Sequence, residues 1–301
     1  MTKDRRVIAC VAPRQYESFL RQRLGAAGYE VEFRIRGAPC ESRQCDPFGI
    51  REVAADVKND VSALILVMPR RAAPAMMAPG PVVEGLPVGL LPSQRPQDLE
   101  PWGRALTDAK TIEPRWAVLA MWRRSYLKLG NRFMRSFELA NRGQAESWFA
   151  DQVTRDSLCK KLASGPSLAI YLGHGRARGL CGYMGVRWQH VIQERTFVPC
   201  STILSVACDT LKYELRRIPF GCRWVTSGRA ASYVGAVDAV PIRASMRLAE
   251  VIRSTLATCV MSNLGMLLQS VDRILSAEPR LQSVHRSFQA YRIIGSPVAP
   301  L

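Results

Sequence analysis

The sequence lacks any apolar run near the length of a membrane span. A span needs about 18 consecutive residues with few or no charges, and no segment of the 301 residues approaches this. The first residues, Met-Thr-Lys-Asp-Arg-Arg, lead into a strand-like segment rather than the apolar core of a secretory signal. Nine cysteines, an odd number scattered through apolar segments, fit a reducing compartment better than a disulfide framework. We therefore expect a cytoplasmic location and no membrane partner.

Motifs for nucleotides and metals are also missing. The N-terminal region contains neither Gly-x-Gly-x-x-Gly nor a Walker A sequence, which argues against dinucleotide or nucleoside triphosphate binding. Cys40 and Cys45 have no nearby third or fourth ligand. Cys181, His190 and Cys200 are irregularly spaced, so they are not typical of a zinc site either. The sequence predicts no cofactor and no metal.

Acidic residues are few relative to basic ones: 25 Asp and Glu stand against 42 Lys and Arg, a formal net charge of +17. Clustered cations bind polyanions. Here the arginines are spread along the chain in pairs such as Arg5-Arg6 and Arg123-Arg124, without a basic tail or an aromatic-rich nucleic-acid motif. A solvated basic surface or an acidic protein partner therefore fits better than nucleic acid, which the charge does not exclude.

Alternating strand and helix patterns predict an α/β fold with a mostly parallel sheet flanked by helices. Residues 5–12, 29–36 and 61–68 have the composition of buried strands, and residues 15–27 and 48–58 have helical periodicity. Near-continuous apolar strands alternating with helices are typical of parallel sheets covered on both faces.

The composition shifts towards Pro, Gly, Ala and Met between residues 69 and 101. Because proline supplies no backbone donor, we expect an irregular connection there, with one short edge strand at 86–90. A second α/β pattern follows, with strands at 116–122, 168–172, 202–207 and 230–237 and helices at 132–141, 145–162, 242–258 and 264–276. We divide the chain into an N-terminal α/β subdomain (1–68), a Pro-rich connection (69–110) and a second α/β domain (111–301).

Two of the predicted strands end in a reactive side chain. The segment SLAIYLGHG places His174 beyond one strand, and STILSVACDT places Cys208 beyond another. Active groups gather outside the carboxyl ends of parallel strands, so the two residues face each other if their strands are neighbours. A thiol with an ordinary pKa of about 8.5 becomes an effective nucleophile when an imidazole accepts its proton.

Glycines on both sides of His174 let the backbone approach a bound carbonyl closely. The amides of Gly175 and Cys208 could then stabilise a tetrahedral oxyanion together. Alone, a Gly-His-Gly segment can be a simple turn, and a Cys at the end of a buried strand is more often a packing residue. Their occurrence together at two strand ends favours a Cys-His dyad.

These segments resemble the catalytic signature of clan CD cysteine peptidases, which include caspases, legumains, separases, gingipains and CHAT-type proteases. The similarity is carried by residues 171–175 (YLGHG) and 204–208 (LSVAC). It is greatest to the gingipain-like branch, because the His-to-Cys interval is short and residues 86–106 resemble that branch's Val-Gly-Arg-Leu-Pro segment and following helix. Leu90 stands where the pattern has Arg. The resemblance covers residues 86–253.

The resemblance implies a caspase- or gingipain-like fold, with a non-catalytic subdomain first and a caspase-like catalytic domain at 111–301. It also implies a cysteine endopeptidase that acts through a thioester acyl-enzyme. Cys208 would be the nucleophile and His174 the general base and acid. The oxyanion hole would consist of the Gly175 and Cys208 amides.

Substrate selection is left open by the sequence. A P1 Arg or Lys needs a carboxylate, for which Asp209 and Asp238 are the candidates. An acidic P1 needs arginine, and the candidates are Arg176, Arg178 and Arg229. Positions where the family builds pocket walls hold Trp224, Ser227 and Tyr233. For each of these residues, a solvated loop charge or a packing role is an equally good interpretation.

Two functions follow from these observations. The first is an active endopeptidase on a protein substrate; because a cytoplasmic protease must be restrained, we expect regulated cleavage of a genomic-neighbour effector in bacterial defence or cell death. The second is a catalytically inactive α/β interaction module that binds an acidic protein or nucleic acid through its basic surface. The presence of both His174 and Cys208 beside glycines favours the enzyme.

Overall fold

The protein is represented by a computed structural model that describes residues 7–35, 50–70, 72–140, 144–214 and 217–301. Most of its strands belong to one sheet. They are β1 Val7–Ala12, β2 Glu30–Ile35, β3 Ala63–Met68, β4 Val82–Val83, β5 Leu86–Pro92, β6 Arg115–Ala120, β7 Gln144–Ser147, β8 Leu168–Leu172, β12 Cys200–Val206, β13 Ala230–Ala236 and β14 Tyr291–Gly295.

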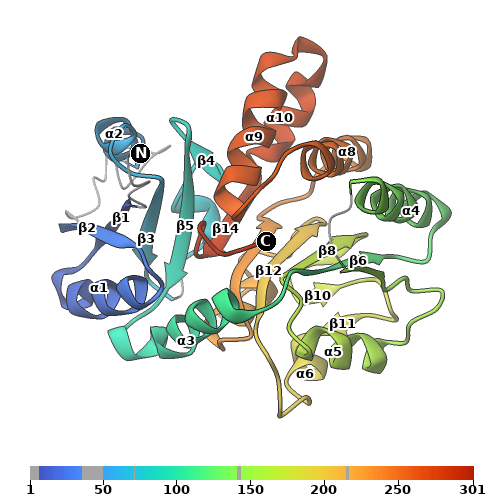
Figure 1. The fold of residues 1–301 in the computed structure, drawn as a ribbon, viewed down its shortest axis with the longest axis horizontal. Helices are drawn as coiled ribbons and strands as arrows, with labels where there is room; N and C mark the ends of the chain where they lie inside the picture. Colours follow the sequence, from blue (N-terminus) through green and yellow to red (C-terminus); the bar gives the residue numbers. More distant parts are fainter. Residues whose placement is uncertain (1–6, 36–49, 71, 141–143, 215–216) are drawn as a thin grey trace.

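The sheet has the order β2-β1-β3-β5-β14-β13-β12-β8-β6-β7, with β4 paired to β5 outside this path (Figure 1). All neighbouring pairs along the path are parallel except β13 and β14. A second, antiparallel sheet consists of β9 Gly175–Arg176, β10 Gly179–Leu180 and β11 Val186–Arg187. The predicted fold class, a mostly parallel α/β sheet flanked by helices, is confirmed.

Helices cover both faces of the large sheet. Figure 1 shows on one side α2 Ile50–Val57, α4 Arg124–Leu139, α8 Ile242–Thr258, α9 Leu264–Ala277 and α10 Gln282–Phe288. The other side carries α1 Glu17–Ala26, α3 Glu100–Asp108, α5 Arg155–Ala163, α6 Trp188–Val191 and α7 Phe220–Thr226. Short 3-10 helices are η1 Arg14–Tyr16, η2 Pro74–Met76, η3 Pro96–Leu99, η4 Ala109–Thr111 and η5 Pro279–Leu281.

Helix α4 illustrates why these elements form. Tyr126, Leu129, Phe133 and Phe137 are buried at intervals of three and four residues, which gives the helix one apolar face against the sheet. Strand β3 differs because all six of its residues are buried, as expected for a parallel strand covered on both faces.

One predicted helix, residues 145–162, is wrong in its first part. Residues Gln144–Ser147 form the edge strand β7 beside β6, and α5 begins only at Arg155. The side chain of Thr154 accepts a hydrogen bond from the Ser157 amide (3.3 Å) and so caps α5. The predicted helix at 132–141 starts earlier instead, at Arg124.

The Pro-rich segment contributes a central strand rather than the expected short edge strand. All residues of β5 are buried, and the strand lies between β3 and β14. Pro87 and Pro92 lie near the two ends of β5, where proline disturbs the ladder least. The backbone of Gly89 lies close to Gly295. A Cβ at position 89 would collide with the Gly295 carbonyl oxygen, so glycine is needed there.

Strand β14, which the sequence patterns did not predict, joins the two parts of the sheet. It is parallel to β5 and antiparallel to β13. One sheet runs across residues 68 and 110, the boundaries proposed from the sequence. The division into two α/β parts and a connection remains a prediction.

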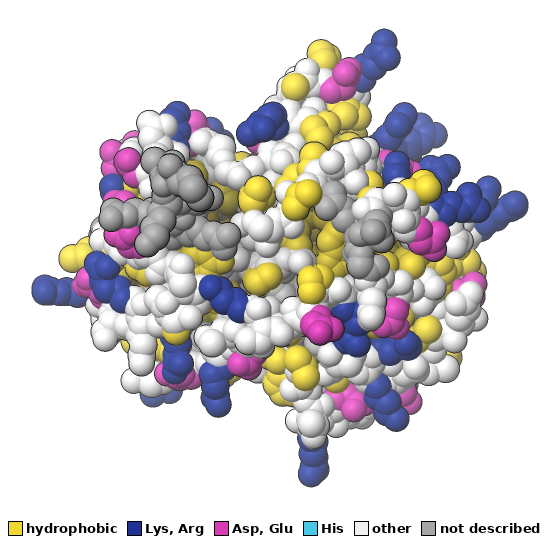
Figure 2. Space-filling model, viewed as in Figure 1, with side chains coloured by type: hydrophobic (Ala, Val, Ile, Leu, Met, Phe, Trp, Pro, Cys, Tyr) yellow, Lys and Arg dark blue, Asp and Glu magenta, His cyan; other side chains and the backbone are white. Residues whose placement is uncertain are grey.

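Basic side chains are distributed widely over the surface. In the view of Figure 2, Lys and Arg project from many parts of the outline and are most numerous over α4 and α8. None of the helices in the described part of the chain combines the length and the apolar character needed to cross a membrane.

Candidate active site

The two candidate catalytic residues follow neighbouring parallel strands. Strands β8 and β12 pair in register, with Leu172 opposite Val206. His174 lies two residues beyond Leu172, and Cys208 lies two residues beyond Val206, so both occupy equivalent positions at the carboxyl edge of the sheet. Both residues are partly exposed.

Gly175 packs directly against the backbone of Cys208. A Cβ at Gly175 would collide with the Cys208 carbonyl oxygen and would lie 2.7 Å from Thr210 Cγ2. Only glycine permits this approach of the two backbones. The segment after β8 and the segment after β12 are therefore in contact at the residues that flank the dyad.

His174 is held in a neutral state by its surroundings. Burial and the adjacent Arg123 guanidinium both lower the pKa of His174. Arg123 Nη1 lies 3.3 Å from His174 Nε2. Because arginine can only donate hydrogen bonds, Nε2 is the acceptor, and the proton of the neutral ring is on Nδ1. The Tyr126 ring packs edge-on against the imidazole at a centroid distance of 5.4 Å.

Buried Tyr171 fixes the backbone around His174. Its hydroxyl donates to the His174 carbonyl oxygen (2.9 Å) and accepts from the Gly182 amide (3.0 Å). The His174 carbonyl also accepts from the Cys181 amide at 2.9 Å. A Cβ at Gly173 would lie 2.5 Å from the Tyr171 hydroxyl oxygen, so glycine is needed here too.

The Cys208 thiol is positioned by the segment after β13. Its Sγ donates to the Val240 carbonyl oxygen and accepts from the Val240 amide, both at 3.3 Å. Burial raises the pKa of Tyr126, the tyrosine that contacts His174, and Cys208 lies near enough to add to this rise. No hydrogen bond joins Cys208 to His174 in the described residues; catalytic hydrogen bonds are commonly long in unliganded sites.

The two carboxylates considered for a basic P1 residue share one lysine. Lys212 Nζ lies 3.6 Å from Asp209 Oδ1 and 4.0 Å from Asp238 Oδ1. Asp209 adopts a left-handed backbone conformation (φ 60°), which is uncommon for a residue other than glycine and frequent at functional sites. Neither carboxylate is an unpaired negative charge.

The arginines considered for an acidic P1 residue lie in two different places. Arg176 and Arg178 follow His174; Arg178 forms an ion pair with Glu214 (3.6 Å). Arg229 is not brought to this edge, because it precedes β13 at the amino end of that strand. Its guanidinium donates to the Glu194 carbonyl oxygen (2.6 Å) and stacks on the Phe197 ring.

The suggested pocket walls lie mostly in the interior. Trp224 and Tyr233 are 4% and 0% exposed, and both pack edge-on against Phe220. Their side chains face the core in this arrangement, because α7 lies against β13. Ser227 is partly exposed near the amino end of β13, with its hydroxyl donating to the Trp224 carbonyl oxygen.

Two residues near the dyad were missed in the sequence. Arg123 and Tyr126 come from the start of α4, just beyond β6. Because β6 is the other neighbour of β8, its carboxyl end lies at the same edge. A signal was present: the apolar segment 116–122 is followed by Arg123, much as the strands before His174 and Cys208 are followed by these residues.

The remaining cysteines and histidines show no metal arrangement in the part of the chain described here. Cys40 and Cys45 lie outside the described residues. Burial raises the pKa of Cys200 to about 12, and its thiol donates to the Leu162 carbonyl oxygen. His190 Nδ1 accepts from the Arg187 amide (3.0 Å) at the start of α6.

No protein-family model matches this sequence, and no curated protein sequence matches it significantly. Solved structures are nevertheless similar. The chain superposes on the Arg-specific cysteine proteinase gingipain R with a TM-score of 0.77 and 13% identity, covering 100% of this chain and 79% of that one. A complex of the Porphyromonas gingivalis RgpB pro- and mature domains superposes with a TM-score of 0.75 at 13% identity. That match covers 98% of this chain and 79% of the other.

The Saccharomyces cerevisiae separase-securin complex is a more distant neighbour. It gives a TM-score of 0.56 at 14% identity and covers 79% of this chain but 16% of the longer one. At these identities the similarity concerns the fold, and the resemblance predicted from the sequence is confirmed at that level. This protein has the caspase-like fold that gingipain R and separase share, in a form near that of gingipain R.

Proposed function

We propose that this protein is a cysteine endopeptidase with Cys208 as nucleophile and His174 as general base and acid. The observation that carries the proposal is the equivalent placement of both residues beyond the paired strands β8 and β12, with Gly175 packed on the Cys208 backbone. A structural cysteine would not require a neutral, partly exposed histidine and a close glycine at the adjacent strand end.

The chemistry follows from this arrangement. His174 takes the Cys208 thiol proton as sulfur attacks the peptide carbonyl carbon, and the carbonyl electrons move to its oxygen. Collapse of this intermediate forms the thioester and breaks the C–N bond, while His174 gives the proton to the leaving amine. His174 then deprotonates a water that hydrolyses the thioester and regenerates the thiol.

The developing oxyanion needs hydrogen-bond donors. The Cys208 amide makes no hydrogen bond to another described residue, whereas the next amide, of Asp209, donates to the Asp238 carbonyl oxygen (3.3 Å). We assign the Cys208 and Gly175 amides to the oxyanion hole, where donors stabilise charge that develops only in the transition state.

Arg123 supports the role of His174 as a base. A cation beside the imidazole disfavours its protonated form, so the ring is unprotonated at neutral pH, which a general base requires, although its affinity for the thiol proton is lower. For His174 to accept the thiol proton on Nε2, the bound substrate must displace Arg123 from that nitrogen, or the imidazole ring must rotate.

The test is cleavage of a mixed peptide library, read by mass spectrometry. Cys208→Ala and His174→Ala should abolish cleavage, whereas the matched controls Cys259→Ser and His190→Ala should retain it. Cys259 is exposed, and His190 is partly exposed in the four-residue helix α6; a Tm measured for each variant checks that both controls keep the fold. Equal cleavage by Cys208→Ala and the wild type would refute the assignment.

We further propose that the substrate is a protein in the same cytoplasm, a genomic-neighbour effector whose cleavage is regulated. Incubation of the purified protein with each neighbour should yield one discrete cut that Cys208→Ala does not make. If no neighbour or library peptide is cut and the protein instead binds an acidic partner, the inactive interaction module is the better function.

A further inference from the structure

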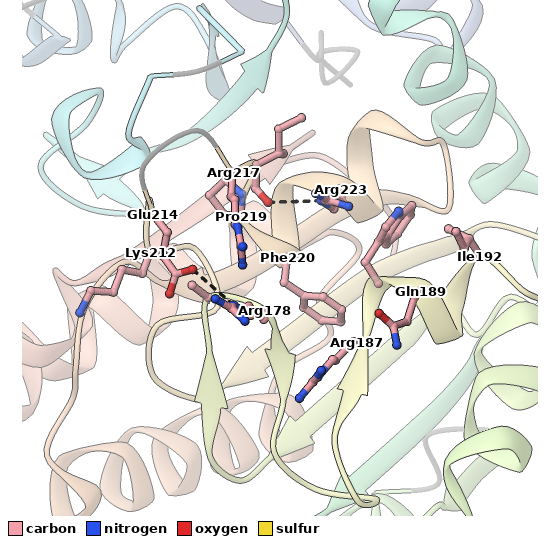
Figure 3. A pocket seen from close by; sticks show the side chains of 13 residues that line it. Arg178, Arg187, Gln189, Ile192, Lys212, Glu214, Arg217, Pro219, Phe220 and Arg223 are labelled. Carbon is pink, nitrogen blue, oxygen red and sulfur yellow. Dashed lines mark hydrogen bonds and ion pairs between the residues drawn. The ribbon is translucent and has the colours of Figure 1, made fainter.

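A pocket of about 450 Å³ lies between the segments that follow the two catalytic strands. One wall comes from residues 177–192, after His174, and the other from residues 212–214 and 217–223, after Cys208. Figure 3 shows Arg178, Arg187, Arg217 and Arg223 around this space, with Glu214 beside Arg178. None of these side chains is used by the proposed catalytic steps.

The pocket is strongly basic. Its cationic side chains are Arg178, Arg187, Lys212, Arg217 and Arg223, and Glu214 is the one acidic side chain among the described residues that line it. Glu214 pairs with Arg178, and Lys212 lies beside Asp209. Arg187, Arg217 and Arg223 form no ion pair with any described carboxylate. Three guanidinium groups are thus left for an anion from outside.

The floor of the pocket is apolar and well packed. Phe220 is 2% exposed and contacts Trp224 edge-on, and Trp224 in turn contacts Trp188. The Phe220 amide donates to the Ala177 carbonyl oxygen (3.1 Å), which ties the two walls together. Arg223 Nε donates to the Ile218 carbonyl oxygen at 3.3 Å, so this guanidinium is held at the pocket rim (Figure 3).

A second hollow adjoins this pocket on the side of the segment that follows His174. It shares Arg178, Arg187 and Glu214 with the first, and it is also lined by Cys181. The Cys181 amide donates to the His174 carbonyl oxygen (2.9 Å), so this hollow begins one hydrogen bond away from the dyad. An extended peptide bound at Cys208 could therefore continue along this hollow into the basic pocket.

We propose that the basic pocket is a substrate subsite that binds an acidic side chain, Asp or Glu, located a short distance along the peptide from the scissile bond. Arg187 and Arg223 supply charge-assisted hydrogen bonds to the carboxylate, and the aromatic floor at Phe220 packs against the methylene groups of the acidic side chain. The proposal rests on the endopeptidase function and adds a substrate class to it: acidic protein segments, which the overall charge of +17 also attracts.

Binding can be measured without cleavage. We would use the full chain carrying Cys208→Ala and follow the fluorescence anisotropy of labelled hexaglutamate and hexaglutamine peptides. Hexaglutamate should bind, hexaglutamine should not, and Arg187→Gln with Arg223→Gln should weaken hexaglutamate binding about tenfold. The matched control is Arg273→Gln with Arg280→Gln, which removes the same charge from exposed positions of α9 and η5.

Equal weakening by the control pair would show that only net charge matters and would overturn the proposal. Tighter binding of labelled hexathymidylate, lost in the same pocket variant, would assign the pocket to nucleic acid and also overturn it. Thermal unfolding of each variant shows that the binding losses do not reflect misfolding.

Cleavage gives the second measurement. A library peptide cut by the wild type is resynthesised with each Asp or Glu changed to Asn or Gln. At one position this change should lower kcat/KM about tenfold in the wild type and hardly at all in the Arg187→Gln, Arg223→Gln variant. If the wild type cuts the peptides with and without acidic residues at the same kcat/KM, the subsite is refuted and the peptidase function stands. If the wild type cuts no peptide at all, the peptidase function is refuted, and the anisotropy measurement alone decides whether the pocket binds acidic peptides.

Discussion

Replacing Gly175 with alanine tests the contact that aligns the two catalytic segments. The added Cβ would collide with the Cys208 carbonyl oxygen and lie 2.7 Å from Thr210 Cγ2 and 3.0 Å from Ala207 Cβ. All three are closer than an ordinary contact of about 3.5 Å between carbon atoms. The neighbouring Cys208 backbone must therefore move, at a cost of about 1–3 kcal/mol in folding free energy.

A movement approaching about 1 Å at the nucleophile costs about 100-fold in rate. We expect Gly175→Ala to lower kcat/KM for a library-derived peptide by that factor and Tm by about 2–6 °C. The matched control is Gly25→Ala in α1, whose Cβ meets no atom within 4 Å. It should retain full activity and gain about 0.5–1 kcal/mol of stability from the better helix former. Wild-type kcat/KM and wild-type Tm in Gly175→Ala would refute the reasoning.

Three other predictions concern titration, the hydrogen bonds behind the histidine, and the central strands. Because the pKa of His174 is lowered, the acid limb of the kcat/KM profile should lie below pH 6.5, and Arg123→Gln should move it upward; an unmoved limb would contradict the role of Arg123. The same lowered pKa means that the fold binds fewer protons than the unfolded chain, so its stability should fall as the pH drops below about 6.5. Tyr171→Phe leaves the Gly182 amide without its acceptor and should cost about 1–3 kcal/mol in urea unfolding, with a loss of activity larger than the loss of folded protein; equal losses would mean a purely structural role. Gly89→Ala should cost about 1–3 kcal/mol, because the Cβ collides with β14, while leaving the kcat/KM of the folded fraction unchanged.

The sequence predicted the elements whose signals are local. Apolar strands such as β8 and β12 are recognisable from their composition, and a reactive residue two positions beyond each one marks the carboxyl edge of a parallel sheet. His174 and Cys208 could therefore be nominated before their strands were known to be neighbours.

Long-range pairing could not be predicted in the same way. Strand β14 is five residues long and lies after a run of helices, so its period is too short to identify. The central position of β5 depends on β14, and prolines at both ends of β5 made an irregular segment the better local interpretation. The contact between Arg123 and His174 likewise depends on the order of β6 and β8.

The basic pocket illustrates the same difference. Its arginines are ordinary loop charges in the sequence, since nothing local shows that residues 177–192 face residues 212–214 and 217–223. The backbone hydrogen bond from Phe220 to Ala177, the ion pair between Arg178 and Glu214, and the pairing of β8 with β12 bring them together.

The position of β14 in the chain bears on how the protein folds. Strands β5 and β13 each need β14 as a neighbour, yet β14 is synthesised about 200 residues after β5 and about 55 after β13. Until it docks, a growing chain exposes two unpaired strand edges, which are templates for aggregation. Closing the sheet from such distant segments also makes folding slow, because much chain entropy is lost before the contacts form. Expression should therefore depend on chaperones more strongly than the size of the protein alone would require.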